Sequence, residues 1–223
     1  MDIIAWRGDS YTHEENTIEA CRSAVGKGFD RIEIDVRLTA DNVLVAYHSP
    51  TMSSWDYYKS MTEILWEELK TLSKNEYYVS RVKDILVDSP ANYLLHLKRE
   101  NCTSAILDAL VDLPYPVDVH SNSETLLSAV KHLPTVFRVF KSIYKAPDHI
   151  LEWVDGYMVG HRAGFGSSPI SNRFLTELKE ADKIIWTFAG NTEQWLKEVS
   201  ETPTDGVLTA RIDRARRIFY GQV

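Results

Sequence analysis

The 223-residue sequence contains only two cysteines and no long run of apolar residues. Cys21 and Cys102 are far apart, form no ligand pair and sit in apolar stretches, where cysteine usually behaves as a small core residue. The sequence therefore excludes a scaffold stapled by disulfides, and a reducing cytoplasm is the expected location. Because no window approaches about 18 uncharged apolar residues, we expect no membrane span. Charges at positions 2 and 7 also argue against a secretory signal.

The sequence also lacks a long block of one charge sign. It has 25 Lys and Arg against 32 Asp and Glu, which gives a net charge of −7. Because an unspecific grip on a phosphate backbone needs a basic stripe, the sequence disfavours general nucleic-acid binding. A small anionic substrate stays compatible with this charge if a few cations or a metal ion gather in a cleft.

Linker-like segments are absent as well, because no stretch rich in glycine, serine or proline divides the chain. A chain of this length, with 44% apolar residues, typically buries about 70% of its unfolded surface. We therefore expect one domain over residues 1–223.

Short β-type runs alternate along the chain with longer segments of helical period. The predicted strands cover residues 2–6, 31–36, 92–98, 117–120, 136–140, 156–159, 184–188 and 206–209. The predicted helices cover residues 17–27, 61–72, 103–111, 123–133, 172–181 and 192–199. Eight strands with helical crossovers in about 220 residues indicate an α/β fold of the (β/α)8 TIM-barrel class. A doubly wound open sheet would give a similar alternation.

The predicted helix at residues 17–27 has signals at both ends. Asn16 and Glu19 have the spacing of a capping box at its start. Gly28 suits the cap at its end, because glycine adopts the left-handed conformation at no steric cost.

A second local signal follows the second predicted strand. Asp41 and Asn42 form a good turn pair, which predicts a hairpin-like extension that carries His48 back toward the mouth of the barrel. Residues 49–60 have no regular period, and residues 161–168 lack any recognised phosphate-loop spacing. We expect both segments to form loops.

Glu33 and Asp35 lie two residues apart near the end of the second predicted strand. The period of two sends both carboxylates to one face, toward the barrel interior. Two close carboxylates in a dry cavity need a cation, a shared proton or a basic partner. A divalent metal ion is the economical explanation, and oxygen ligands favour Mg²⁺, Ca²⁺ or Mn²⁺. Alternatively, one acid pairs with Arg31 or Arg37 and lies outside.

Basic residues close two other predicted strands. Arg7 stands beside Gly8 at the end of the first strand, where a guanidinium could grip a phosphate or a carboxylate. His96 and Lys98 occupy alternate positions in an otherwise apolar run, so they should share one face.

Together these segments resemble the glycerophosphodiester phosphodiesterase family, one of the phosphodiesterase barrels similar to phosphatidylinositol-specific phospholipases C. The family pattern opens with His-Arg-Gly, Pro-Glu-Asn-Thr, Glu-x-Asp-Val and His-Asp, and matches follow in order and spacing over about the first 50 residues. Later segments resemble the family's Glu-x-Lys, Trp-Thr and Asp-Gly-Ile-Ile-Thr strands. The matching residues here are Trp6-Arg7-Gly8, Glu14-Glu15-Asn16-Thr17, Glu33-Ile34-Asp35-Val36, His48-Ser49, Leu97-Lys98, Ile185-Trp186-Thr187 and Asp205-Gly206-Val207-Leu208-Thr209.

The resemblance implies a barrel that hydrolyses a glycerophosphodiester or a related small or lipid-derived phosphodiester. Glu33 and Asp35 would bind the divalent cation. Arg7, a member of the catalytic set, and Lys98 would steady the phosphate. This division makes chemical sense because metal and cations offset the charge that develops on the phosphate oxygens.

The resemblance also assigns an acid and a substrate-binding wall. His48 would be the general acid toward the leaving alkoxide, since an imidazole with a pKa near about 6.5 can donate a proton at neutral pH. Glu15, Asn16 and Trp186 would help to bind the substrate.

Three departures from the family pattern bear on activity. Trp6 stands where the family has its first histidine, and an indole has no basic lone pair. His96 stands where the family has a third metal carboxylate, which should weaken magnesium or calcium binding more than manganese or zinc binding. Ser49 replaces the aspartate after the second histidine. His13 or a metal-bound water could supply the missing base.

Two functions therefore stand as alternatives. In the first, the chain is a divergent metal-dependent phosphodiester hydrolase. In the second, it is a catalytically degraded barrel that binds a phosphorylated ligand or a protein. The retained set favours the first, whereas the loss of site residues favours the second.

Overall fold

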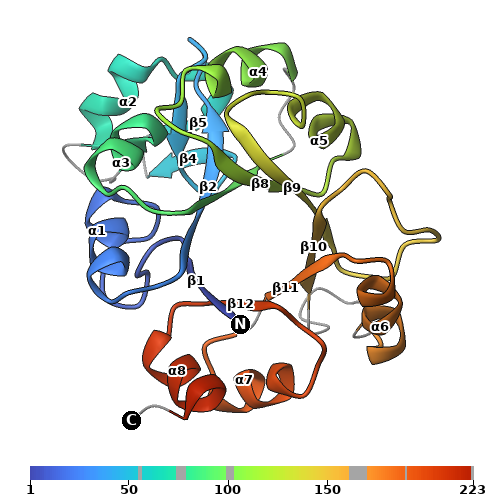
Figure 1. The fold of residues 1–223 in the computed structure, drawn as a ribbon. Coiled ribbons are helices and arrows are strands. Elements are labelled where there is room, and N and C mark those ends of the chain that lie inside the picture. The colour runs from blue at the N-terminus through green and yellow to red at the C-terminus, as the bar shows by residue number, and fades with distance from the viewer. Residues whose placement is uncertain (55–56, 74–78, 99–102, 161–169, 189, 222–223) are drawn as a thin grey trace.

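The computed structural model describes residues 1–54, 57–73, 79–98, 103–160, 170–188 and 190–221. Eight parallel strands in this part of the chain close into a ring, because β1 pairs with both β2 and β12 (Figure 1). The ring confirms the predicted (β/α)8 barrel and excludes the open sheet. Its strands are β1 (Asp2–Trp6), β2 (Arg31–Leu38), β7 (Tyr93–Leu97), β8 (Val117–Ser121), β9 (Val136–Ile143), β10 (Gly156–Gly160), β11 (Ile184–Phe188) and β12 (Gly206–Thr209).

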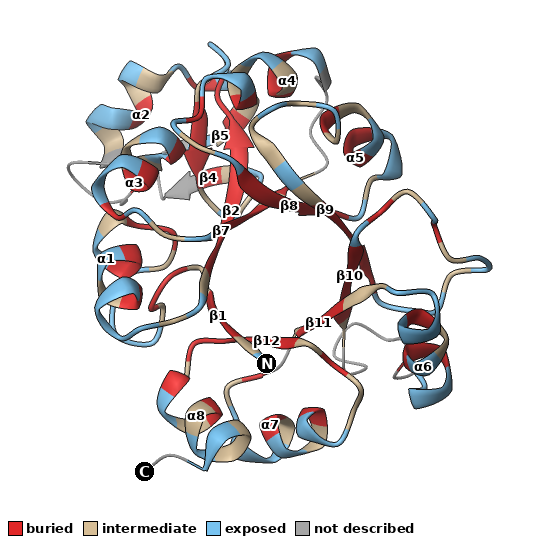
Figure 2. Cartoon of the chain, in the orientation of Figure 1, coloured by how far each residue is buried: buried red, intermediate tan, exposed pale blue. Residues whose placement is uncertain are grey.

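The helices lie around the outside of the ring (Figure 1). Their outer sides are exposed, whereas the strands are mostly buried (Figure 2). Apolar residues such as Ile34 and Val36 of β2 pack with residues of the helices in the largest core cluster. The helices are α1 (Ile18–Gly26), α2 (Trp66–Ser73), α3 (Val82–Asp88), α4 (Thr103–Val111), α5 (Glu124–Val130), α6 (Asn172–Glu180), α7 (Glu193–Ser200) and α8 (Ile212–Tyr220).

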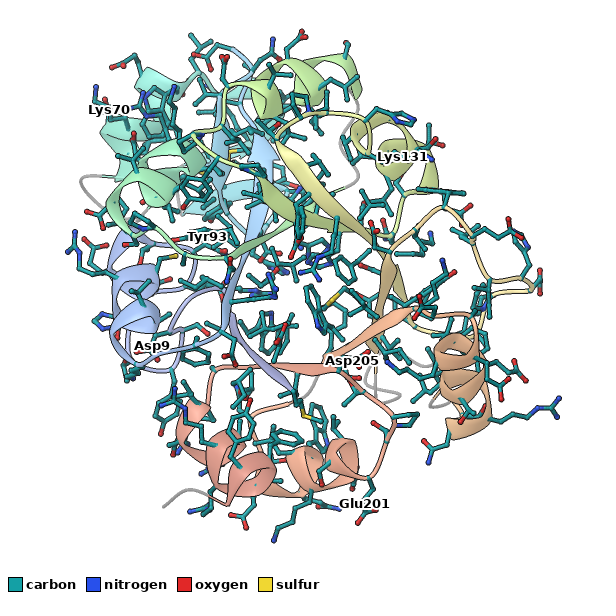
Figure 3. The ribbon with its side chains drawn as sticks, viewed as in Figure 1. Asp9, Lys70, Tyr93, Lys131, Glu201 and Asp205 are labelled. Atoms are coloured by element: carbon teal, nitrogen blue, oxygen red, sulfur yellow. The ribbon has the colours of Figure 1, made fainter. Side chains whose placement is uncertain are left out.

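Side chains fill the centre of the ring (Figure 3). The middle layer is apolar and comes from alternate strand positions, as expected for the packed interior of a small barrel. It contains Ile4, Leu94, Phe140, Met158, Trp186 and Leu208. This layer separates the two ends of the barrel.

The amino-terminal end of the barrel holds a polar cluster of its own. Asp118, which is 2% exposed, accepts hydrogen bonds from Arg31 at 2.9 Å and from Arg138 at 2.7 and 3.0 Å. Both guanidinium groups also lie about 5 Å from the Trp186 ring, at 5.1 and 5.2 Å. Arg31 therefore forms its ion pairs with Asp2 and Asp118 at the amino-terminal end. Among the described residues, no ion pair joins it to Glu33 or Asp35.

An antiparallel extension interrupts the barrel between β2 and β7. β3 (Leu44–Ala46) pairs with the end of β2, and Asn42 has a φ of 61° in the turn, so the predicted hairpin is confirmed. The prediction of a loop for residues 49–60 is wrong, because β4 (Thr51–Ser54) and β5 (Tyr57–Ser60) form a second hairpin. Its strands are short, and Met52 anchors them in a separate apolar cluster with Met61.

Other local predictions also need correction. The predicted helix 61–72 is two elements, a 3₁₀ turn at Met61–Glu63 followed by α2, and α3 was not predicted. The cap of α1 is Thr17, whose hydroxyl accepts from the Ala20 amide at 3.1 Å, and not Asn16. Gly28 has a φ of +70° just after the helix, as predicted.

Two features of the sequence fall outside the part of the chain that the structure describes. They are Cys102 and residues 161–168. Within the described part, Cys21 is a buried free thiol. None of the helices in the described part of the chain has the length and hydrophobicity that crossing a bilayer would require.

Two glycine substitutions test how tightly the barrel wall is packed. A Cβ atom at Gly156 would lie 2.3 Å from the Ile184 carbonyl oxygen and 2.8 Å from the Phe140 ring, whereas one at Gly26 meets nothing within 4 Å. We expect Gly156→Ala to lower the free energy of unfolding by about 2–3 kcal/mol, the cost of overpacking. Gly26→Ala should leave it unchanged or raise it by up to about 1 kcal/mol.

Thermal or urea unfolding of the two variants measures this difference. For a domain of this size, Gly156→Ala should lower the melting temperature by about 4–10 °C. Equal melting temperatures for the two variants would show that the contact between β10 and β11 has room to adjust.

Candidate active site

A sharp turn after β1 brings the first functional residues to the mouth of the barrel. Arg7 and Asn16 both have a φ of 60°, and Gly8 between them has a φ of +76°. Such values are uncommon for an arginine and cost of the order of 1 kcal/mol or more, so the surrounding contacts must hold them. The Arg7 carbonyl accepts from the Asn16 amide at 3.0 Å, and the Arg7 amide donates to Glu33 Oε2 at 3.1 Å.

Asp35 is the centre of the charged contacts. Only 1% of its side chain is exposed, and it forms ion pairs with Arg7 Nε at 2.9 Å and with Lys98 Nζ. Asn16 brackets it, donating from Nδ2 to Asp35 Oδ2 at 3.3 Å and accepting from the Asp35 amide at 2.9 Å. His96 Nδ1 lies 3.0 Å from Asp35 Oδ1.

Burial alone would raise the pKa of Asp35, but the hydrogen bond with His96 and the charges of Lys98 and Arg7 outweigh it. The pKa of Asp35 is therefore lowered, and the carboxylate stays ionised. Its negative charge is matched by cations of the chain itself.

Glu33 has a different environment on the same face of β2. Its side chain is 1% exposed, and its closest polar neighbours are the Arg7 amide, His96 Nδ1 at 3.7 Å and His120 Nε2 at 3.6 Å. Burial, followed by the negative charge of Asp35, raises the pKa of Glu33 to about 8. Glu33 is therefore the acid that lacks a full counter-charge.

Two histidines from neighbouring strands stand opposite Glu33. His96 of β7 and His120 of β8 are paired in register, and their rings stack with centroids 4.1 Å apart. Burial lowers the pKa of both rings, well below 6.5 for His120, so His120 is neutral at pH 7. Ligand atoms of Glu33, His96 and His120 all lie within 4.8 Å of one another.

Sequence reasoning predicted His96 as a candidate ligand but missed His120. His120 is the inward residue near the end of a predicted strand, and this position was the available signal. A lone histidine in an apolar strand carries no motif. Only the register between β7 and β8 places the two rings together.

The hairpin after β2 delivers His48 to the same end. The Arg37 guanidinium holds the chain there, donating to the His48 carbonyl oxygen at 2.6 and 3.0 Å. Arg37 therefore fixes the end of the hairpin through the His48 carbonyl. Among the described residues, no ion pair joins it to Glu33 or Asp35. Burial lowers the pKa of His48; the Asp35 charge raises it, while the Arg7 and Lys98 charges lower it further.

The remaining predicted residues divide between the site and the barrel interior. Both carboxylate oxygens of Glu15 accept from Arg7 Nη1, at 2.8 and 2.9 Å. Lys98 Nζ lies 2.8 Å from His96 Nδ1. Trp6 lies beneath Arg7, whose guanidinium carbon is 5.0 Å from the indole ring.

Trp186 is not brought to this cluster. It is 1% exposed and stacks on Phe140 in the apolar layer, with centroids 4.1 Å apart. Its side chain lies in that layer inside the barrel, and a role for Trp186 in substrate binding stays a prediction. His13 is exposed on the loop after β1.

The donor atoms present can be matched against a divalent cation. The buried Nε2 of His120 has no hydrogen-bond partner among the described residues and lies 3.6 Å from Glu33 Oε1, so its lone pair is available to a cation beside that carboxylate. Asp35 already has Arg7, Lys98, His96 and Asn16 around it. The ligand atoms of Glu33, His96 and His120 therefore fit an ion. Glu33 is common to this group and to the predicted pair, and ligation by Asp35 stays a prediction.

Two imidazoles and one carboxylate suit manganese, zinc or a similar transition ion better than magnesium or calcium, which prefer oxygen ligands. The structure thus contains a possible metal site, formed by residues of β2, β7 and β8.

The solved structures to which this chain is similar in fold include two phosphodiesterases. A phosphodiesterase from Oleispira antarctica, in complex with the product sn-glycerol-3-phosphate, is 19% identical with a TM-score of 0.78, covering 98% of this chain and 96% of that chain. A glycerophosphodiester phosphodiesterase from Thermotoga maritima is 18% identical with a TM-score of 0.77, covering 96% of both chains.

Two of the sequence relatives are described as glycerophosphodiester phosphodiesterases. A glycerophosphodiester phosphodiesterase from Bacillus altitudinis is 20% identical over 97% of both chains. Another, from Caldanaerobacter subterraneus subsp. tengcongensis, is 50% identical over 50 residues, which are 22% of this chain and 21% of that relative. The model of the glycerophosphoryl diester phosphodiesterase family matches residues 7–151, well over half of the sequence. The chain therefore belongs to the glycerophosphoryl diester phosphodiesterase family.

Proposed function

We propose that this chain is a metal-dependent phosphodiester hydrolase that acts on a glycerophosphodiester or a related small or lipid-derived phosphodiester. The observation that carries the proposal is the arrangement at the carboxyl ends of β1, β2, β7 and β8. There, two cations of the chain lie beside Glu33, His96 and His120, within one buried cluster. An anionic phosphodiester needs both parts of this arrangement.

Arg7 and Lys98 would hold the phosphate. Arg7 uses Nε and Nη1 for Asp35 and Glu15, and its Nη2 makes no hydrogen bond with the described residues. This nitrogen can therefore donate to a phosphate oxygen while Asp35 and Glu15 keep the guanidinium in place. Asn16 orients Asp35 through two hydrogen bonds.

A divalent ion bound by Glu33, His96 and His120 would supply Lewis-acid stabilisation of the charge that develops on phosphate oxygens. His48 would donate a proton to the leaving alkoxide, which is the difficult part of cleaving a phosphodiester. Its pKa below 6.5 makes the protonated ring a stronger acid, at the cost of a smaller protonated fraction at pH 7.

A second function is favoured by a specific observation. Trp6 packs against the apolar layer, and its indole offers no nitrogen that could accept a proton. If hydrolysis needs a base at this position, the barrel would bind a phosphorylated ligand without cleaving it. Substrate hydrolysis and metal binding separate the two functions.

Metal binding provides the first prediction. We expect wild-type protein to bind Mn²⁺ or Zn²⁺ in calorimetry, and His120→Phe, which keeps a ring of similar size, to weaken binding at least about 100-fold. Removal of one of three ligands should exceed the 10–100-fold loss typical of an outer partner. The exposed His132 provides the matched control, and His132→Phe should bind as tightly as wild type. Equal metal affinities for the two variants would show that His120 is not a metal ligand.

The second prediction concerns His48. Bis-p-nitrophenyl phosphate and glycerophosphocholine should be hydrolysed in the presence of Mn²⁺, and His48→Ala should lower kcat about 10²–10⁴-fold, most for the poorer leaving group of glycerophosphocholine. Because a general acid must be protonated, kcat should fall as pH rises through the lowered pKa of His48, below 6.5. A pH–rate profile measures this limb. A limb that survives in His48→Ala belongs to another group.

The third prediction concerns Trp6. Trp6→His would restore a basic nitrogen beside Arg7, so we expect kcat to rise at least about 10-fold. The steady-state rate on glycerophosphocholine measures the effect, with Trp66→His on α2 as the control for loss of an indole. If wild type binds sn-glycerol-3-phosphate but neither wild type nor Trp6→His hydrolyses a diester, the binding function is the correct one.

A further inference from the structure

Ser142 is a buried hydroxyl that touches the candidate site only through His120. It lies on β9, is 3% exposed, and its Oγ is 2.9 Å from His120 Nδ1. No other hydrogen bond of its hydroxyl is found among the described residues. The ring of His120 therefore has Ser142 at one nitrogen and Glu33 at the other.

A histidine that ligates a cation is a neutral imidazole, which carries one hydrogen on its two nitrogens. When the hydrogen is on Nε2, the Ser142 hydroxyl must donate to Nδ1, and Nε2 points its hydrogen at Glu33 Oε1 from 3.6 Å. When the hydrogen is on Nδ1, it is donated to Ser142 Oγ, and Nε2 presents a lone pair to the space between His120 and Glu33. Only the second arrangement can ligate a cation from Nε2.

We propose that Ser142 is the positioning residue that selects the Nδ1-protonated tautomer of His120, so that Nε2 is a ligand for a divalent cation held with Glu33 and His96. The inference rests on the metal site of the proposed function. It goes further by naming the residue that sets the orientation and tautomer of one ligand. A hydroxyl suits this task because its oxygen accepts the hydrogen of Nδ1, which leaves the lone pair of Nε2 for the cation.

The position of Ser142 in the fold supports this role. β8 and β9 are paired with a register shift between Val117 and Asp118, after which His120 is opposite Phe140 and Ser121 is opposite Lys141. Ser142 thus lies diagonally across from His120, within reach of its ring. A side chain on α5 or in a loop would not be fixed so firmly.

Zinc binding by the metal-free full-length protein tests the proposal. We expect Ser142→Ala to weaken Zn²⁺ binding about 10–100-fold in calorimetry, the usual loss for an outer partner of a ligating histidine. Ser142→Thr, which keeps the hydroxyl, should bind within about threefold of wild type. Ser89→Ala removes a buried hydroxyl that does not contact His120 and serves as the control.

The tautomer itself is visible by nitrogen NMR, which does not depend on turnover. In the zinc-loaded wild type, long-range ¹H–¹⁵N spectra should show the His120 hydrogen on Nδ1. In metal-free Ser142→Ala the balance between the two tautomers should differ from that of metal-free wild type. A purely structural role for Ser142 would change the melting temperature without changing this balance.

Several results would overturn the proposal. These are zinc affinity of Ser142→Ala within about twofold of wild type, a zinc-loaded His120 with its hydrogen on Nε2, or a wild type that binds no divalent cation. A wild type that binds zinc through His120 but hydrolyses no diester would contradict the proposed function and leave the role of Ser142 supported. If Ser142→Thr does not fold, the wild-type tautomer decides.

Discussion

Two carboxylates on one face of β2, both buried, are the constraint around which this barrel is organised. Neither can stay ionised in a dry interior without compensation. Asp35 receives the charges of Arg7 and Lys98, so its pKa is lowered. Glu33 lies one pleat deeper, beside His96, His120 and the Arg7 amide. Burial and the negative charge of Asp35 outweigh the charges of Lys98 and Arg7, so the pKa of Glu33 is raised to about 8. β2 thus carries Asp35, whose charge is balanced by Arg7 and Lys98, and Glu33, whose charge is not fully balanced by nearby cations.

This asymmetry also explains the strained turn after β1. The left-handed conformations of Arg7 and Asn16 are held because the Arg7 amide reaches Glu33 while the Arg7 guanidinium reaches Asp35. Asn16 is diverted from capping α1 to bracketing Asp35, and Thr17 takes over the cap. Thr17 therefore stabilises the start of α1, while Asn16 fixes the orientation of the Asp35 carboxylate.

The barrel interior separates this charged mouth from a second polar cluster at the opposite end. An apolar layer lies between them, with Phe140 stacked on Trp186. Arg31 and Arg138 pair with Asp118 on the far side of this layer, so the charge balance at Glu33 depends on the residues of the mouth. The family fold is thus retained with a possible metal site in which two histidines stand beside one carboxylate.

The sequence by itself determined the strand and helix pattern, because alternation of apolar residues follows the geometry of each element and needs no long-range contact. It also placed Glu33 with Asp35 and His96 with Lys98, since side chains two apart on a strand share a face. The hairpin at residues 51–60, the pairing of Asp35 with Arg7 and Lys98, and the meeting of His96 with His120 were decided only by the tertiary structure. Those features depend on the register between neighbouring strands, and residues brought together by register across a ring leave no signature in the local order of the chain.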